Sequence, residues 1–174
     1  MTTERRELGQ SPFAGGEIPE DVRAEIDHWL ARFPADQRQS AVLGALRAAQ
    51  HANGGHLDRL AMDAVADYLE MPRIAVYEVA SFYSMFELEP VGRHSVSVCT
   101  NVSCMLNGSD DLLAAIESHL GIKLGETTAD GRIFLKREEE CLAACTAAPM
   151  MQVDHVYHVN LTKERAIAIL DALD

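Results

Sequence analysis

The chain has 174 residues, enough for one moderate domain or two small ones, and 48% of them are hydrophobic, enough to build cores. Its net charge of -12 argues against nucleic acid and anionic lipid headgroups as partners, because both are negatively charged. No run approaches the ~18 apolar residues of a membrane span, and the N-terminus lacks the apolar stretch of a signal peptide. We therefore expect a cytoplasmic chain with reduced cysteines, no direct membrane insertion, and a protein as its partner.

The first half of the chain has the periodicity of helices. Residues 1–17 are polar and contain glycine, which predicts a mobile tail. Four segments follow in which apolar residues recur with helical spacing and in which proline or glycine marks the joints. These predicted helices cover residues 18–33, 36–53, 57–69 and 72–86. Because the joints are short, residues 18–89 are expected to pack as a four-helix bundle.

At Pro90-Val91-Gly92 the pattern changes from helical periodicity to strand alternation. Residues 90–174 predict strands and helices in the order βαβββα, which makes the chain α+β overall. Strands are expected at 95–99, 133–137, 150–153 and 156–159, and helices at 109–120 and 162–173. Ser109 and Thr162 are the predicted N-caps of these two helices.

All four cysteines lie in the second half, as two pairs. Cys99 and Cys104 stand in C-T-N-V-S-C, and Cys141 and Cys145 stand in C-L-A-A-C. Four thiolates suit either zinc or an iron-sulfur centre, since soft sulfur ligands favour both. Zinc sites often have two residues between paired cysteines, whereas the wider spacing here is better matched to a 2Fe-2S core, in which each iron takes a pair. The spacing alone leaves both metals open, while the C-x-x-C motif of a dithiol enzyme is absent.

Longer motifs carry a resemblance to a known family. The segments C-T-N-V-S-C-M-L-N-G and R-E-E-E-C-L-A-A-C-T-A-A-P-M-M, with Y-L-E-M-P-R-I-A-V-Y-E-V-A-S-F-Y-S-M-F before them, resemble the thioredoxin-like 2Fe-2S ferredoxin family. The likeness covers about residues 18–173. It implies a thioredoxin-like α/β domain over 90–174, and Pro149 stands where such folds place a cis proline. The family's C-x4-C and C-x3-C pattern falls on Cys99, Cys104, Cys141 and Cys145, which the resemblance makes the ligands of one 2Fe-2S cluster.

Within that family the chain looks most like the small cluster-bearing subunits of bacterial NADH:quinone oxidoreductase, respiratory complex I. The resemblance implies an electron carrier that exchanges electrons with the flavin of a neighbouring NADH-binding subunit, among other peripheral-arm subunits on the cytoplasmic side of the inner membrane. It would be part of an enzyme without a substrate site of its own. No Rossmann fingerprint, phosphate loop or nucleophile elbow occurs, so we expect no flavin or NAD site on this chain.

Other interpretations remain at this point. An NAD-linked formate dehydrogenase or bidirectional hydrogenase uses a similar subunit, and a zinc-stabilised scaffold that transfers no electrons would also explain four cysteines. The triplet Glu138-Glu139-Glu140 is either a solvated segment or a source of negative charge that lowers a cluster's reduction potential. The seven histidines show no Rieske-type spacing to the cysteines, so we expect ordinary surface or hydrogen-bonded histidines.

Overall fold

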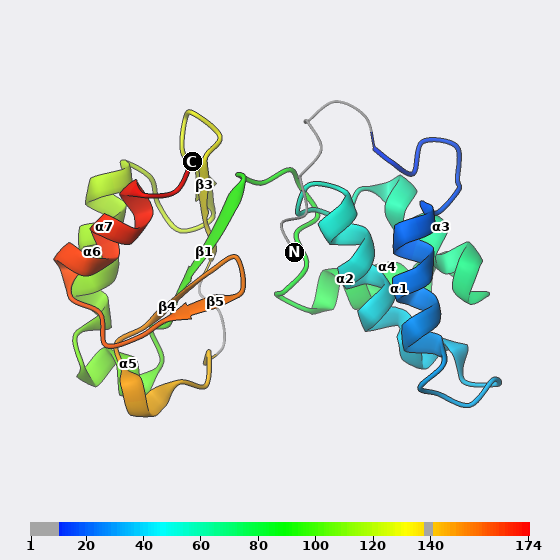
Figure 1. The fold of residues 1–174 in the computed structure, drawn as a ribbon, viewed down its shortest axis with the longest axis horizontal. Coiled ribbons are helices and arrows are strands. Elements are labelled where there is room, and N and C mark those ends of the chain that lie inside the picture. The colour runs from blue at the N-terminus through cyan, green and yellow to red at the C-terminus, as the bar shows by residue number, and fades with distance from the viewer. Residues whose placement is uncertain (1–10, 138–140) are drawn as a thin grey trace. The chain divides into compact units, whose positions relative to one another are not determined.

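The computed structural model describes residues 11–137 and 141–174. These residues form two compact units, one ending at Pro90 and the other beginning at Val91, each with its own core (Figure 1). Among the described residues, no helix combines the length and apolar character needed to cross a membrane.

The first unit is helical, with helices at all four predicted positions. Its elements are α1 (Glu20–Leu30), the 3-10 helix η1 (Arg38–Ala41), α2 (Val42–Ala52), α3 (Arg59–Leu69) and α4 (Arg73–Phe82). The segment expected to be one helix from residue 36 therefore begins as a 3-10 turn. Alanines at 45, 49, 61 and 64 pack with larger apolar side chains such as Ile26, Leu46 and Leu69 in one buried core, which lets the helices approach closely.

Local chemistry sets the ends of these elements. The Asp58 carboxylate accepts a hydrogen bond from the Ala61 amide at 2.7 Å and caps α3.

Gln50 is a buried polar side chain in α2, but both ends of its amide are satisfied. Its Nε2 donates to the Met85 carbonyl oxygen at 3.1 Å, and its Oε1 accepts from the Glu87 amide at 2.8 Å. This pair of bonds fastens the segment after α4 to α2.

Phe13 corrects the expected extent of the tail. It lies within residues 1–17, yet its side chain is fully buried in the helical core. Burying a phenylalanine side chain contributes ~1.5–3 kcal/mol toward holding this segment against the core, and the polar residues around Phe13 gave no sign of the contact in the sequence. Residues 11–17 thus belong to the helical unit, while residues 1–10 lie outside the described residues.

The second unit is a mixed five-stranded sheet with helices. Its elements are β1 (His94–Val98), α5 (Val102–Leu106), α6 (Ser109–Leu120), β2 (Glu126–Thr127), β3 (Ile133–Leu135), the 3-10 turn η2 (Cys145–Ala147), β4 (Met151–Val153), β5 (Val156–His158) and α7 (Lys163–Asp171). The strand order is β2-β3-β1-β4-β5, in which β1 and β3 are parallel and the other pairs antiparallel.

One face of this sheet carries the core of the second unit. Val96 and Val98 of β1 share that core with Leu112 and Ile116 of α6 and with residues of α7 such as Leu170. The alternation along β1 places Val96 and Val98 on the same face, so α6 and α7 cover that face together (Figure 1). The C-terminal end of β1 leads directly into Cys99.

Three local expectations for this unit are corrected. Helix α5 was not predicted, because five residues are too few to show helical periodicity. Strand β2, which pairs with β3, is also absent from the predicted strands, because two residues are too few to show alternation. Ser109 is the first residue of α6 rather than its cap; Gly108 holds the cap position, and the buried Ser109 Oγ has no hydrogen-bond partner among the described residues. Thr162 is confirmed as the cap of α7, accepting from the Arg165 amide at 3.2 Å.

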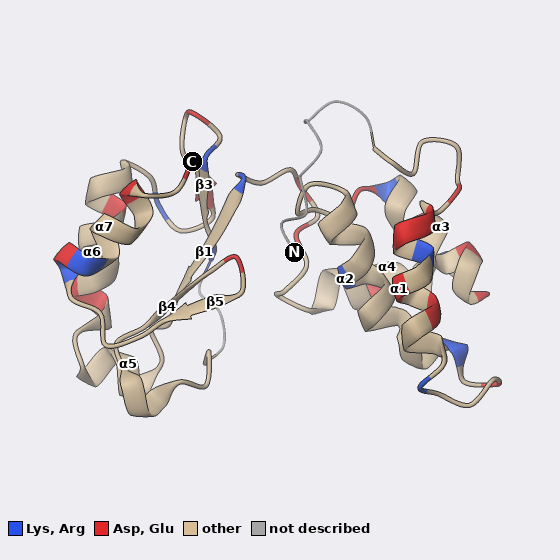
Figure 2. Cartoon of the chain, in the orientation of Figure 1, with Lys and Arg blue, Asp and Glu red and all other residues tan. Residues whose placement is uncertain are grey.

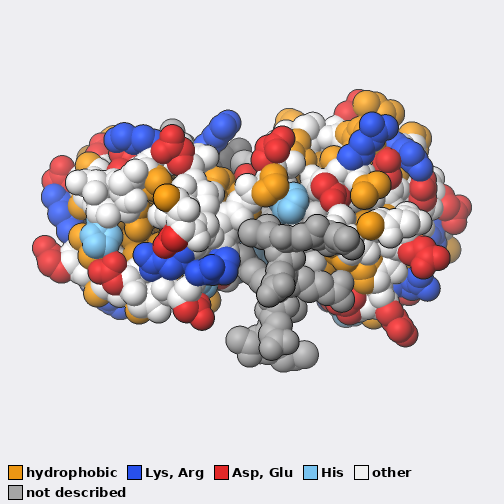
Figure 3. Space-filling model, turned by 90° about the horizontal axis from the view of Figure 1, so that it is seen from above, with side chains coloured by type: hydrophobic (Ala, Val, Ile, Leu, Met, Phe, Trp, Pro, Cys, Tyr) orange, Lys and Arg blue, Asp and Glu red, His pale blue; other side chains and the backbone are white. Residues whose placement is uncertain are grey.

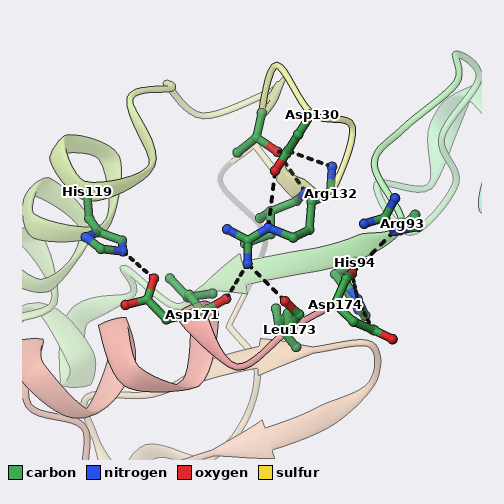
Figure 4. Close-up of polar contacts among 11 residues, drawn as sticks. Arg93, His94, His119, Asp130, Arg132, Asp171, Leu173 and Asp174 are labelled. Carbon is green, nitrogen blue, oxygen red and sulfur yellow. Dashed lines mark hydrogen bonds and ion pairs between the residues drawn. The ribbon is translucent and has the colours of Figure 1, made fainter.

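Arg132 joins the start of β3 to the end of α7. Its guanidinium donates to the carbonyl oxygens of Leu170 and Leu173, each at 3.0 Å, and pairs with the Asp130 carboxylate at 3.4 Å (Figure 4). The last carbonyls of a helix lack partners within the helix, so a cation there is favourable.

The surface mixes charge with apolar groups. Figure 2 shows Asp and Glu on both units, with Lys and Arg among them. Hydrophobic side chains also reach solvent on the helical unit (Figure 3), where Ile74 and Phe82 of α4 are 64% and 80% exposed.

Candidate metal centre

The first cysteine pair is buried at the end of β1. Cys99 directly follows the strand, and its amide donates to the Met150 carbonyl oxygen at 3.2 Å. Cys104 lies in α5, which is capped by Asn101, whose side chain accepts from the Val102 amide at 2.8 Å. Both residues are at most 3% exposed. The strand and the short capped helix therefore fix both thiols inside the unit.

The second pair lies in the segment before β4. Cys141 and Cys145 are exposed, and their sulfurs are 3.7 Å apart. Cys145 begins the 3-10 turn η2, and Ala143 between the two cysteines has a left-handed backbone with φ of 59°. The backbone of this loop thus curls so that both thiols point to the same place.

The two pairs meet. Leu142 and Met150 form one buried cluster with Cys99 and Cys104, and the Cys99 thiol lies within hydrogen-bonding reach of both Cys104 and Cys141. The Ser103 hydroxyl adds a direct link between the loops by donating to the Cys145 carbonyl oxygen at 3.2 Å. All four cysteines singled out in the sequence are therefore gathered at one place.

Backbone amides point at the sulfurs. The Ala143 amide donates to Cys141 Sγ at 3.3 Å. The amides of Leu142 and Asn101 donate to the Cys99 sulfur, and the Met150 amide donates to the Cys104 sulfur. Donors of this kind stabilise negative charge on sulfur, as a thiolate or as a metal ligand.

The ionisation of the thiols reflects their closeness. Burial opposes ionisation of Cys99, but the amide donors and the neighbouring thiols bring its pKa below the usual value. Burial, together with the hydrogen bond and charge of Cys99, raises the pKa of Cys104 to about 11. The hydrogen bond and charge of Cys141 raise the pKa of Cys145. One thiolate makes the next harder to form, so a metal cation at this place would replace protons and relieve the repulsion.

The donor set can be tested against the two metals that the sequence left open. Within residues 11–137 and 141–174, no three or more His, Cys, Asp or Glu side chains are arranged as a site for a single metal ion. Four thiols suit either zinc or a 2Fe-2S core, and a 2Fe-2S core would be held by two cysteines on each iron. One buried pair and one exposed pair, joined by hydrogen bonds, fit that requirement.

Other residues singled out in the sequence have ordinary structural roles. The Ala148-Pro149 peptide bond is cis, just before the buried Met150. His94 Nδ1 is 2.6 Å from an Asp154 oxygen. His119 Nε2 is 2.7 Å from an Asp171 oxygen (Figure 4), so hydrogen bonds account for both histidines. Glu138, Glu139 and Glu140 lie outside the described residues, so the hypothesis about their charge stays a prediction.

Two contact residues were missed in the sequence. Ser103 links the loops, and the Tyr157 hydroxyl donates to the Leu142 carbonyl oxygen at 2.7 Å. The position of Ser103 between Cys99 and Cys104 is only a weak signal for such a contact. Tyr157 lies 12 residues beyond Cys145, and only the folding of the chain brings it near the second cysteine loop.

Comparisons with known proteins show which chains this one is similar to. The E subunit of NADH-quinone oxidoreductase from Rickettsia felis is 45% identical over 142 residues, which cover 82% of this chain and 84% of that protein. The second E subunit of the same enzyme from Rhizobium meliloti is 46% identical, covering 87% of this chain and 88% of the relative. The mitochondrial NADH dehydrogenase (ubiquinone) flavoprotein 2 of Dictyostelium discoideum is 42% identical, covering 86% of this chain and 60% of the relative.

A solved structure shares the fold. The NAD+-reducing NiFe hydrogenase in its H2-reduced state aligns with a TM-score of 0.65 and 24% identity, over 75% of this chain and 22% of that one. At this identity the likeness concerns the fold alone. The family described as thioredoxin-like 2Fe-2S ferredoxin matches residues 26–174. With that match and relatives above 40% identity over most of its length, the chain belongs to the thioredoxin-like 2Fe-2S ferredoxin family.

Proposed function

We propose that this chain is the 2Fe-2S electron-carrier subunit of the NADH-oxidising module of an NADH:quinone oxidoreductase, complex I. The observation that supports this most is the convergence of two cysteine loops whose sulfurs already receive backbone N–H donors. Cys99, Cys104, Cys141 and Cys145 hold the cluster in this proposal. A bound 2Fe-2S cluster supplies one-electron transfer.

The chain's own residues then have three tasks. The buried pair Cys99 and Cys104 anchors the site in the fold and keeps water from one side of it. The exposed pair Cys141 and Cys145 leaves the other side open to the redox group of a partner. The amides of Leu142 and Ala143 stabilise negative charge on the ligand sulfurs and so tune the electron affinity of the site.

The partner in this proposal is the flavin- and NADH-binding subunit of the same complex, together with other peripheral-arm subunits. Flavin and NADH bind on that partner, and this chain is placed peripherally on the cytoplasmic side of the inner membrane. The helical segment 18–89 is assigned as a bundle domain and 90–174 as the cluster domain. Relatives named as quinone oxidoreductase subunits are much more similar in sequence than the hydrogenase, which favours complex I as the host.

Metal analysis of the purified chain tests the proposal. We expect iron and acid-labile sulfide in equal amounts, about two of each per chain, with a red-brown colour and a paramagnetic signal after reduction. A colourless protein with about one zinc per chain and no sulfide would overturn the proposal in favour of a structural zinc site. Co-purification of a flavoprotein with NADH dehydrogenase activity tests the assignment to complex I, and co-purified formate dehydrogenase or hydrogenase subunits would contradict it.

A further inference from the structure

Tyr157 reaches from the β4–β5 hairpin to the second cysteine loop. In the hairpin it pairs with Gln152. Its hydroxyl donates to the Leu142 carbonyl oxygen at 2.7 Å, an unstrained distance for an O–H donor. This contact holds the loop from outside the cysteine segment itself.

The contact controls the direction of an amide. The Leu142 carbonyl and the Ala143 N–H belong to one planar peptide group, and in the trans form they point in opposite directions. The Ala143 N–H donates to Cys141 Sγ at 3.3 Å. A hydrogen bond that fixes the carbonyl on one edge of the group therefore fixes the N–H toward the sulfur on the other edge.

Ala143 shows why this peptide group needs to be held. Its φ of 59° lies in the left-handed region, which the Cβ of alanine makes unfavourable. Turning the Leu142–Ala143 peptide group by about half a turn would bring Ala143 to an ordinary negative φ. The same turn would take the N–H away from Cys141 Sγ and bring a carbonyl oxygen toward it. Relief of the backbone strain at Ala143 thus favours the rotated peptide group, in which the N–H···S bond is broken. The Tyr157 hydroxyl opposes this rotation because it binds the Leu142 carbonyl oxygen.

We propose that Tyr157 is a positioning residue that sets the reduction potential of the cluster by holding the Ala143 N–H against the Cys141 sulfur. This inference rests on the proposed function. An N–H dipole at a ligand sulfur stabilises the added electron and raises the potential, whereas a carbonyl oxygen in its place lowers it. Tyr157 does this without touching the sulfur.

The test is a redox titration of the cluster-loaded full chain, in which the paramagnetic signal of the reduced cluster is measured at each potential. Tyr157→Phe keeps the ring and removes only the hydroxyl, and we expect a lower midpoint potential with wild-type iron and sulfide content. Tyr68→Phe is the matched control, because it removes a tyrosine hydroxyl that donates to Asp27 in the helical unit. The control should keep the wild-type potential. A wild-type potential in cluster-loaded Tyr157→Phe would overturn the inference.

A rescue variant separates positioning from general damage. Glycine adopts positive φ without the penalty of alanine, so Ala143→Gly added to Tyr157→Phe should restore much of the lost potential. Pulsed paramagnetic measurements in D2O should show an exchangeable deuteron near the cluster in wild type, weakened in Tyr157→Phe and recovered in the double variant. If Tyr157→Phe loses iron, recovery of iron in the double variant supports the inference, and continued loss overturns it. A wild-type chain without iron would instead overturn the proposed function, and this inference with it.

Discussion

The Ser103 hydroxyl donates a hydrogen bond to the Cys145 carbonyl oxygen at 3.2 Å. Ser103 directly precedes Cys104 of the first cysteine pair, whereas Cys145 belongs to the second pair, so the two residues lie far apart in the sequence. A bond between protein groups therefore joins the two loops independently of any metal. Both loops are also attached to the β1 and β4 strands, which pair with each other, so the fold brings the two cysteine loops together.

Replacing any one cysteine tests the ligand set. Cys99→Ser, Cys104→Ser, Cys141→Ser and Cys145→Ser should each lose most of the 2Fe-2S absorbance and reduced-state signal, because a hydroxyl is a much poorer ligand than a thiolate. Iron and sulfide analysis and visible spectra measure this. Normal spectra in all four variants would contradict the assignment.

Removing the link between the loops should have a smaller effect. Ser103→Ala deletes one partly exposed hydrogen bond, so we expect a loss of about 0.5–1 kcal/mol in the free energy of unfolding of the metal-free chain. Iron release to a chelator should become faster in the loaded chain, because the loops separate more easily. Ser103→Thr, which keeps a hydroxyl, is the control and should release iron at nearly the wild-type rate. Equal release rates for Ser103→Ala and wild type would show that the link is unimportant.

The cysteine site could be predicted from the sequence because its signals are local. Pairs of thiols with fixed spacing are visible without a fold, and the long amphipathic helices are visible through their repeated apolar positions. The start of α7 was also visible, because Thr162 is a typical capping residue at the beginning of an amphipathic segment. Such features depend on residues a few positions apart.

The missed features depend on contacts between distant residues. Strand β2 exists because Glu126 and Thr127 pair with β3, and Phe13 is ordered because a distant helical core receives it. Tyr157 meets Leu142 only after β5 has folded back along β4. A sequence pattern cannot show such contacts, because the free energy that selects them comes from tertiary packing.

Gly92 offers a test of close backbone packing in the second unit. A Cβ at this position would lie 2.7 Å from the Phe134 amide nitrogen and 2.8 Å from the Ile133 carbonyl carbon. Both are backbone atoms of β3, so relief requires moving the strand. We expect Gly92→Ala to reduce the free energy of unfolding by about 1–3 kcal/mol. Urea denaturation would measure this, and a wild-type midpoint would show that the strand can shift freely.

Asp130 predicts a defined pH dependence of stability. The Thr128 hydroxyl donates to its carboxylate at 2.5 Å and the Arg132 amide at 3.0 Å, and these bonds, with the Arg132 charge, lower the Asp130 pKa. Because the folded pKa is below the unfolded value of about 3.9, the stabilisation is fully present well above pH ~4. It is lost as the pH falls below ~4 and through the folded pKa.

The variant Asp130→Asn removes the charge and the bond from Arg132 Nε, while its amide oxygen can still accept from the Thr128 hydroxyl and the Arg132 amide. Its metal-free chain should be less stable than wild type near neutral pH, and the difference should shrink as the pH falls below ~4 and through the folded pKa. The same carboxylate holds Arg132 toward the end of α7 (Figure 4), so the loss should also increase amide exchange at the last turn of that helix. Urea midpoints over a pH series test the coupling. A stability difference that stays constant down to the lowest pH at which the chain folds would mean that the carboxylate charge contributes nothing.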